Sequence, residues 1–180
     1  MSRRIKFKRD KFKKLVHYIA HKADPTKLGK TKMNKILWYS DIFAYLDNGK
    51  PITGETYIKR QFGPVSKNIL DILDELVDEN KIAIRDIDNF FGYEKKDFVS
   101  LNRPELKEFT AEEISLVDAL IEIICEEHTA FSISEASHDR IWELAEIGEE
   151  IPYCAIFASR LAEIDEDDIA WAKEKLGKVA

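Results

Sequence analysis

The chain has 180 residues, of which 44% are hydrophobic and 34% are charged, and its formal net charge is −6. The length corresponds to about one domain, large enough to fold without a disulfide or a structural metal. A mean hydropathy of −0.34 and the high charge exclude a membrane protein, and 7 glycines with 5 prolines exclude collagen-like and low-complexity chains. We expect residues 1–180 to form a single domain.

The charges are distributed unevenly along the chain. Residues 1–35 contain 13 Lys or Arg against 2 acidic residues, a net charge of +11, whereas residues 104–180 contain 6 against 20, a net charge of −14. Either these two ends attract each other within one fold, or they form two surfaces for two different partners.

The cysteines and the N-terminal sequence indicate a cytoplasmic protein. Cys125 and Cys154 lie in apolar stretches and form no CxxC pair, which is typical of buried thiols in a reducing compartment. The basic N-terminus is not followed by the apolar segment of a signal peptide, and no window approaches the roughly 18 apolar residues of a membrane span.

Apolar periodicity predicts two helices in the first part of the chain, over about 8–23 and 31–47. Pro25 and Gly29 end the first helix, and Asn48-Gly49 ends the second. The second helix is apolar almost all the way round, which indicates a central helix that packs on several sides.

The next segment is predicted to be a loop and a short extended stretch, followed by a helix that Pro64 opens and that continues to about residue 80. Its apolar stripe includes Leu70 and Val77. Alternating residues over 82–87 and 97–101 then predict a hairpin, and we expect Tyr57 to contribute to the same small antiparallel sheet.

Helices return in the last part of the chain. Capping boxes at Thr110-x-x-Glu113 and Ser132-x-x-Glu135 predict helices that end near residues 127 and 148. Segments that begin at Pro152 and Asp165 complete the chain, and residues 156–180 are expected to form an acidic helical tail that packs on the front half. The predicted fold class is α+β, predominantly α-helical, with a small antiparallel sheet or hairpin.

The helix of residues 66–80 and the hairpin after it resemble the recognition helix and wing of a winged-helix DNA-binding domain. DNA phosphates would repel the outward acids of this helix, so we expect that it does not read DNA. The basic residues of segment 3–14 still allow weak, non-specific contact with nucleic acid, and the alternative is a solvated or tail-paired face. The outward acids are Asp71, Asp74, Glu75 and Asp78, with Lys67 as the exception.

Patterns for catalysis and metal binding are weak. His17 and His21 have the spacing at which two imidazoles share a metal, but we expect them to face solvent among lysines, with no third ligand nearby. Ser137-His138-Asp139 contains the residue types of a catalytic triad, yet neighbours on one helical turn point about 100° apart. We expect no enzyme, no metal and no cofactor.

The ordered motifs resemble one known family, the SocA-like antitoxin or Panacea domain, which includes the phage-associated GepA type. Its first signature is similar to Lys35-Ile-Leu-Trp-Tyr-Ser, Gly49-Lys-Pro-Ile-Thr-Gly-Glu-Thr-Tyr57 and Phe62-Gly-Pro-Val65. Its second resembles Ile133-Ser-Glu-Ala-Ser-His138, Trp142, Gly148 and Ile151-Pro-Tyr153. The resemblance spans about residues 30–155. The motif positions expected to serve the fold are Tyr39, Gly49, Pro51, Gly63, Pro64, Ser137, His138 and Trp142.

The resemblance implies a non-enzymatic protein of prophages and other mobile elements that neutralises a cognate toxin by direct binding. One branch of the family resembles a proteolytic adaptor that hands its toxin to a Clp-type protease. A nucleic-acid-binding regulator associated with a phage or mobile element is the alternative, supported by the basic first helix and the hairpin.

We expect the toxin to contact residues 50–64. Tyr57 and Phe62 supply apolar contact area there, and Lys50, Lys59 and Arg60 supply positive charge on a short segment that we expect to be exposed. The alternative surface is the acidic tail, whose charge would attract a basic toxin.

Overall fold

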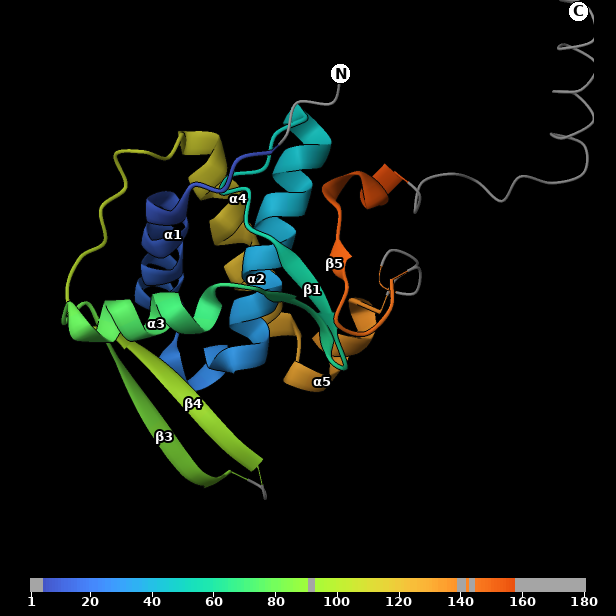
Figure 1. Ribbon diagram of the computed structural model, residues 1–180. Helices are drawn as coiled ribbons and strands as arrows, with labels where there is room; N and C mark the ends of the chain where they lie inside the picture. Colours follow the sequence, from blue (N-terminus) through green and yellow to red (C-terminus); the bar gives the residue numbers. More distant parts are fainter. Residues whose placement is uncertain (1–4, 91–92, 139–141, 143–144, 158–180) are drawn as a thin grey trace, which may run out of the picture.

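The computed structural model describes residues 5–90, 93–138, 142 and 145–157 (Figure 1). Helix α2 runs through the centre, and α1, α4, α5 and the strands β2 and β4 pack against it. The predicted fold class, α+β and predominantly helical, is confirmed. The helices are α1 (Arg9–Lys22), α2 (Pro25–Asn48), α3 (Ile69–Asp78), α4 (Ala111–Glu122), the π-helical turn Ile123–Glu127, α5 (Ala130–Ala136) and the 3₁₀ turn Tyr153–Ala155.

The central position predicted for residues 31–47 is confirmed. Ile36, Leu37 and Trp38 are at most 2% exposed, so successive faces of α2 are all covered. The helix starts earlier than predicted, at Pro25, and Gly29 interrupts it with a non-helical backbone (φ 60°, ψ 167°). Pro25 therefore opens a helix as well as marking the end of the one before it.

The apolar stripe of α1 packs on α2 as its periodicity predicts. Phe12, Leu15, Val16 and Ile19 have no exposed surface. Burying side chains of this size stabilises a fold by about 1.5–3 kcal/mol each. The described residues share one hydrophobic core, whereas the single domain over 1–180 stays a prediction, because residues 158–180 of the expected tail lie outside the described residues.

The strands form two separate antiparallel sheets, and the prediction of one sheet that includes Tyr57 is wrong. One sheet has the order β2-β1-β5, and the other is the β3–β4 hairpin, which extends away from the helices in Figure 1. Tyr57 pairs with Ser66 on one side and with Ile151 on the other. The strands are β1 (Tyr57–Arg60), β2 (Gly63–Ser66), β3 (Ile82–Phe90), β4 (Tyr93–Ser100) and β5 (Glu150–Ile151).

Two predicted helix starts are also wrong. Pro64 lies in β2 opposite Lys59, and α3 begins only at Ile69. Proline is tolerated in β2 because this strand is at the sheet edge. The capping box at Thr110 is confirmed, whereas α5 is capped by Thr129 instead of Ser132.

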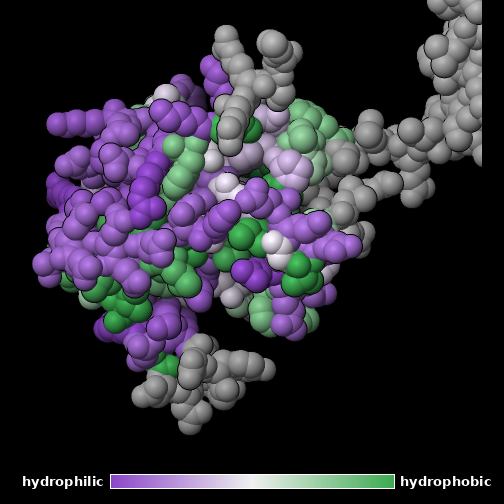
Figure 2. All heavy atoms as spheres, viewed as in Figure 1, coloured by the Kyte–Doolittle hydropathy of each residue, from purple (hydrophilic) through white to green (hydrophobic). Residues whose placement is uncertain are grey.

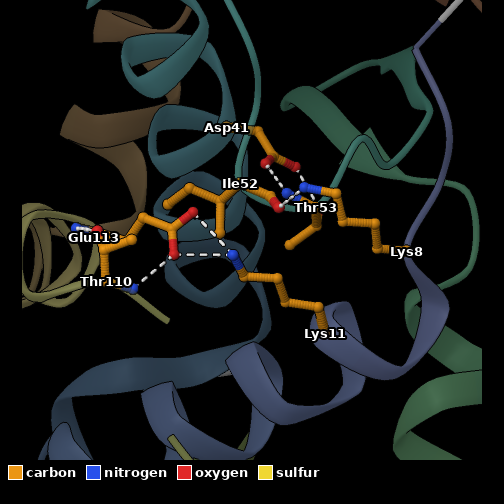
Figure 3. Close-up of polar contacts among 7 residues, drawn as sticks. All are labelled: Lys8, Lys11, Asp41, Ile52, Thr53, Thr110 and Glu113. Carbon is orange, nitrogen blue, oxygen red and sulfur yellow. Dashed lines mark hydrogen bonds and ion pairs between the residues drawn. The ribbon is translucent and has the colours of Figure 1, made fainter. Parts of the chain in front are cut away.

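The basic α1 is held by acidic residues of α3 and of segment 105–118. Lys11 is 8% exposed, and its Nζ lies 2.8 Å from both carboxylate oxygens of Glu113 (Figure 3). On the other side, Lys13 and Lys81 hold the pKa of Glu79 at about 2. The two ends of the chain therefore attract each other within the fold, as one of the two interpretations of the charge distribution predicted. The other ion pairs of α1 are Arg9–Glu75, Lys13–Glu75, Lys14–Glu105, Lys14–Glu108 and Lys22–Asp118, and Lys27 of α2 pairs with Glu126.

None of the helices described is both long enough and apolar enough to cross a bilayer.

Candidate functional site

The separate motifs of the sequence meet at the turn between β1 and β2. Gly63 has a φ of +101°, and a Cβ there would lie 1.9 Å from Nζ of Lys35 on α2 and 2.4 Å from Oγ of Ser137, just after α5. Lys35 also donates a hydrogen bond of 2.5 Å to the carbonyl of Phe62. The turn therefore requires glycine at position 63, because only the absence of a side chain lets these three segments meet.

The end of β1 is fixed by aromatic and backbone contacts. Nζ of Lys59 lies 3.8 Å from the ring centroid of Trp142 and donates to the carbonyl of Ala145 at 2.8 Å. The indole of Trp142 donates to the carbonyl of Arg60 at 3.1 Å, and the ring of His138 stacks on it with centroids 4.0 Å apart. These contacts hold the hairpin against Trp142 and Ala145.

A buried polar network anchors the other end of the β1 segment. Asp41 has no exposed surface, and its carboxylate accepts from the amide of Thr53 at 2.7 Å and from the Thr53 hydroxyl at 2.5 Å (Figure 3). The hydroxyls of Tyr57 and Tyr153 lie 3.0 and 3.3 Å from the same carboxylate. Burial raises the pKa of Asp41, and these hydrogen bonds oppose the shift.

The tyrosine hydroxyls offer the network a way to accommodate a proton on Asp41. Each hydroxyl has one proton, and its nearer acceptor is a backbone carbonyl: Leu37 at 2.8 Å for Tyr57, and Glu55 at 2.6 Å for Tyr153. A protonated Asp41 can donate to either hydroxyl oxygen, which leaves every group paired. The network is sealed from solvent, so it supports the fold and offers no access to a substrate.

The expected partner-binding residues do not share one surface. Tyr57 and Lys59 are 1% and 7% exposed, so the expectation that they lie on an exposed segment is wrong. Ile151 and Tyr153 lie against Tyr57, and Trp142 and Ala145 lie against Lys59. Lys50 is exposed, but it follows the C-terminal end of α2. With a rise of 1.5 Å per residue, that end lies ~20 Å from Lys35 along the helix axis. Arg60 and Phe62 are exposed at the turn, Phe62 by 62%.

The motif residues expected to serve the fold have mainly internal contacts. Tyr39 stacks on Phe43 with ring centroids 5.4 Å apart, and Gly49 ends α2 in the left-handed conformation. Pro51 and Pro64 are buried. Their roles in the family stay a prediction.

A groove lies beside the exposed turn, and sequence reasoning missed it. It has a volume of about 420 Å³ and lies between α2, β2 and the start of α3. Leu70, predicted to be buried in the apolar stripe of α3, is 57% exposed at this groove, and Val77 of the same stripe is 38% exposed. Figure 2 shows hydrophobic surface beside the lower end of the β1–β2 hairpin, next to a largely hydrophilic face.

The histidine pair is not arranged as expected. His17 is 3% exposed instead of facing solvent, and its Nε2 lies 3.2 Å from Oγ of Ser100 and 3.1 Å from the carbonyl of Asn102. Burial lowers the pKa of His17. His21 is exposed and contacts the same serine hydroxyl. Within the described ranges, no three His, Cys, Asp or Glu residues are grouped to hold a metal ion.

The outer face of α3 is acidic, as the sequence predicts. Asp71, Asp74 and Asp78 are exposed, while Ile69, Ile72, Leu73 and Leu76 are buried. A DNA phosphate next to this face would meet three carboxylates.

Comparison with family models matches residues 33–143 to the family described as antitoxin SocA-like, Panacea domain. Neither the curated proteins nor the solved structures include a significant match to the chain. The matched residues contain the Lys35 helix, the Gly63 turn, Ser137 and Trp142, whose contacts form the site, and they make up more than half of the chain. The chain therefore belongs to the SocA-like antitoxin family, the family of the Panacea domain.

Proposed function

We propose that this protein is an antitoxin that neutralises a cognate toxin by binding it directly in the cytoplasm, with no catalytic step. The observation that carries the proposal is the match of residues 33–143 to an antitoxin family. An antitoxin of this kind needs a binding surface in place of a reaction centre, and the buried Asp41 network is not open to a substrate.

We propose the exposed β1–β2 turn as the centre of the toxin-binding surface. Phe62 and Arg60 belong to the residue classes that dominate binding energy at protein interfaces. The backbone between them is held at both ends, by Lys35 at the Phe62 carbonyl and by Trp142 at the Arg60 carbonyl. A rigid turn loses little conformational entropy on binding, which favours affinity.

Growth rescue tests the proposal. The chain is co-expressed with the product of a neighbouring reading frame that arrests growth on its own, and wild type is expected to restore growth. Phe62→Ser combined with Arg60→Ala should lose rescue, whereas Lys50→Ala, an exposed cation at the other end of α2, should keep it. Thermal melts of the purified variants should match wild type, because the substituted side chains are exposed.

The adaptor role implied by the family resemblance makes a different prediction. If the toxin is handed to a Clp-type protease, rescue is lost in a strain that lacks this protease, and toxin levels rise there. We propose neutralisation by binding, for which rescue persists in that strain and toxin and antitoxin stay together in a complex.

A further inference from the structure

The groove beside the turn has an unusual charge for this protein. Its cationic lining residues come from two elements and a turn: Lys30 and Lys35 from α2, Arg60 from the end of β1, and Lys67 from the turn between β2 and α3. No aspartate or glutamate is among its lining residues, although the chain has 34 acidic residues and a net charge of −6. The groove is therefore a positive site on an acidic protein.

Two of these cations are available to a partner. Within the described part of the chain, Lys30 and Arg60 have no ion pair, and both are exposed. Lys67 pairs with Glu150 at 3.0 Å, in a contact with both side chains more than half exposed. Lys35 is 1% exposed and donates to the Phe62 carbonyl, so it lies beneath the groove and is not open to a partner.

The same groove exposes apolar side chains that the core does not use. Phe62 is 62% exposed and Leu70 is 57% exposed, and both line it. A volume of about 420 Å³ accommodates a few side chains, which matches the side chains that a short linear segment places into a groove. Covering these two residues removes apolar area from water and favours binding.

We propose that this groove binds a linear segment of the cognate toxin in which carboxylate side chains alternate with apolar ones. The carboxylates pair with Lys30 and Arg60, and the apolar side chains cover Phe62 and Leu70. The identity of the partner as a toxin rests on the proposed function, whereas the chemistry of the segment rests on the groove itself.

Nucleic acid fits this groove less well than an acidic peptide does. A nucleic-acid interface covers about 1,000 Å² or more of protein surface. Beyond Leu70 such a surface would extend over the exposed Asp71 and Asp74 of α3, which repel phosphates. A peptide carboxylate needs only the local positive charge.

The test pans a phage-displayed library of random peptides against the full chain and measures the enriched peptides by fluorescence polarisation. The enriched sequences should combine Asp or Glu with Leu, Ile, Phe or Trp. Lys30→Glu with Arg60→Glu should weaken their binding at least about tenfold, and added salt should weaken binding to wild type. The matched control, Lys50→Glu with Lys107→Glu, makes the same change in net charge at exposed positions that do not line the groove.

A second variant covers the case in which the double charge reversal fails to fold. Leu70→Ala removes an exposed side chain and should also weaken binding, with the thermal melt unchanged. The proposal is overturned if no peptide is enriched, if the enriched peptides lack acidic residues, or if both charge-reversal variants bind them equally. It is also overturned if the chain self-associates in analytical ultracentrifugation and only the groove variant becomes monomeric, since the occupant is then a second copy.

The two proposals fail in distinguishable ways. If acidic, apolar peptides bind the groove but no toxin is neutralised, the antitoxin function fails and the groove chemistry stands. If a toxin is neutralised equally by wild type and by the Lys30→Glu, Arg60→Glu variant, the antitoxin function stands and the groove is not the toxin site.

Discussion

Gly63 and Lys35 lie so close together that a Cβ on residue 63 would be 1.9 Å from the Lys35 ammonium. Lys35 belongs to the central helix, and Gly63 opens the edge strand β2. The contact joins the core of the molecule to the turn that carries Arg60 and Phe62. It explains why a glycine, a lysine and the distant Ser137 form one structural unit.

Gly63→Ala should destabilise the protein by about 3 kcal/mol or more, because a left-handed backbone strain adds to an overpacked contact. The Lys35 side chain is flexible, but it is 1% exposed and cannot move into solvent without losing the Phe62 carbonyl. Urea denaturation measures the loss. Gly49→Ala is the control, since its φ of +68° is also left-handed but nothing lies within 4 Å of its Cβ, and it should cost only about 1 kcal/mol. Equal losses for both variants would show that the contact has no energetic role.

Asp41 should give the protein an unusual dependence of stability on pH. Burial raises the pKa of Asp41 in the native state above the ordinary value of 3.8. At pH values between the unfolded-state pKa and the native-state pKa, the native state therefore binds more protons than the unfolded state. The stabilisation from this group is fully present below the unfolded-state pKa and is lost as the pH rises through the native-state pKa.

The comparison with Asp41→Asn measures this contribution together with its coupling to Glu55, because asparagine does not titrate and the charge of Asp41 helps to raise the pKa of the buried Glu55. As the pH falls from 7 toward 4, the difference in free energy of unfolding between wild type and Asp41→Asn should shift in favour of wild type. The ion pairs on the surface lose stability on acidification in both proteins and cancel in the difference. A difference that stays constant, or that shifts toward the variant, contradicts the proposed protonation of the network.

Lys11→Met should reduce the free energy of unfolding by roughly 1–2 kcal/mol, because it leaves the partly buried carboxylate of Glu113 without its cation. Lys14→Met removes a more exposed pair with Glu108 and should cost at most about 0.5 kcal/mol. Chemical denaturation of both variants provides the measurement. A larger loss for Lys14→Met would mean that burial does not determine the strength of these pairs.

Double-stranded DNA should bind only weakly and without sequence preference. The exposed acids of α3 repel phosphates, and Arg9, Lys13 and Lys14 are already paired with glutamates. In fluorescence anisotropy, residual binding should disappear as salt is raised. Nanomolar, sequence-selective binding at physiological salt that is lost on substitution in α3 would favour the nucleic-acid-binding regulator instead.

The central elements of the fold could be predicted because their signals are local. Apolar side chains on successive faces mark α2, and the Thr110 capping box marks the start of α4. Pro64 was misassigned because proline is common both at the first turn of a helix and on an edge strand, and only pairing with β1 distinguishes them.

The proposed binding surface was harder to predict because it depends on which segments meet. Tyr57 and Lys59 are covered by residues more than 80 positions later in the chain. Their spacing of two residues on one strand indicates only that they share a face of the sheet. Lys30, Arg60 and Leu70 come from three elements and carry no common local signal. His17 is covered by the end of β4 and the residues that follow it, which lie more than 80 positions later in the chain.

Direct binding between purified wild-type chain and the toxic product of the neighbouring reading frame tests the central claim, and isothermal titration calorimetry measures it without any cellular component. The antitoxin proposal predicts a stable complex of defined stoichiometry that Phe62→Ser with Arg60→Ala weakens by at least about tenfold. If a toxin that wild type neutralises in cells shows no binding to the purified chain, neutralisation by direct binding is wrong.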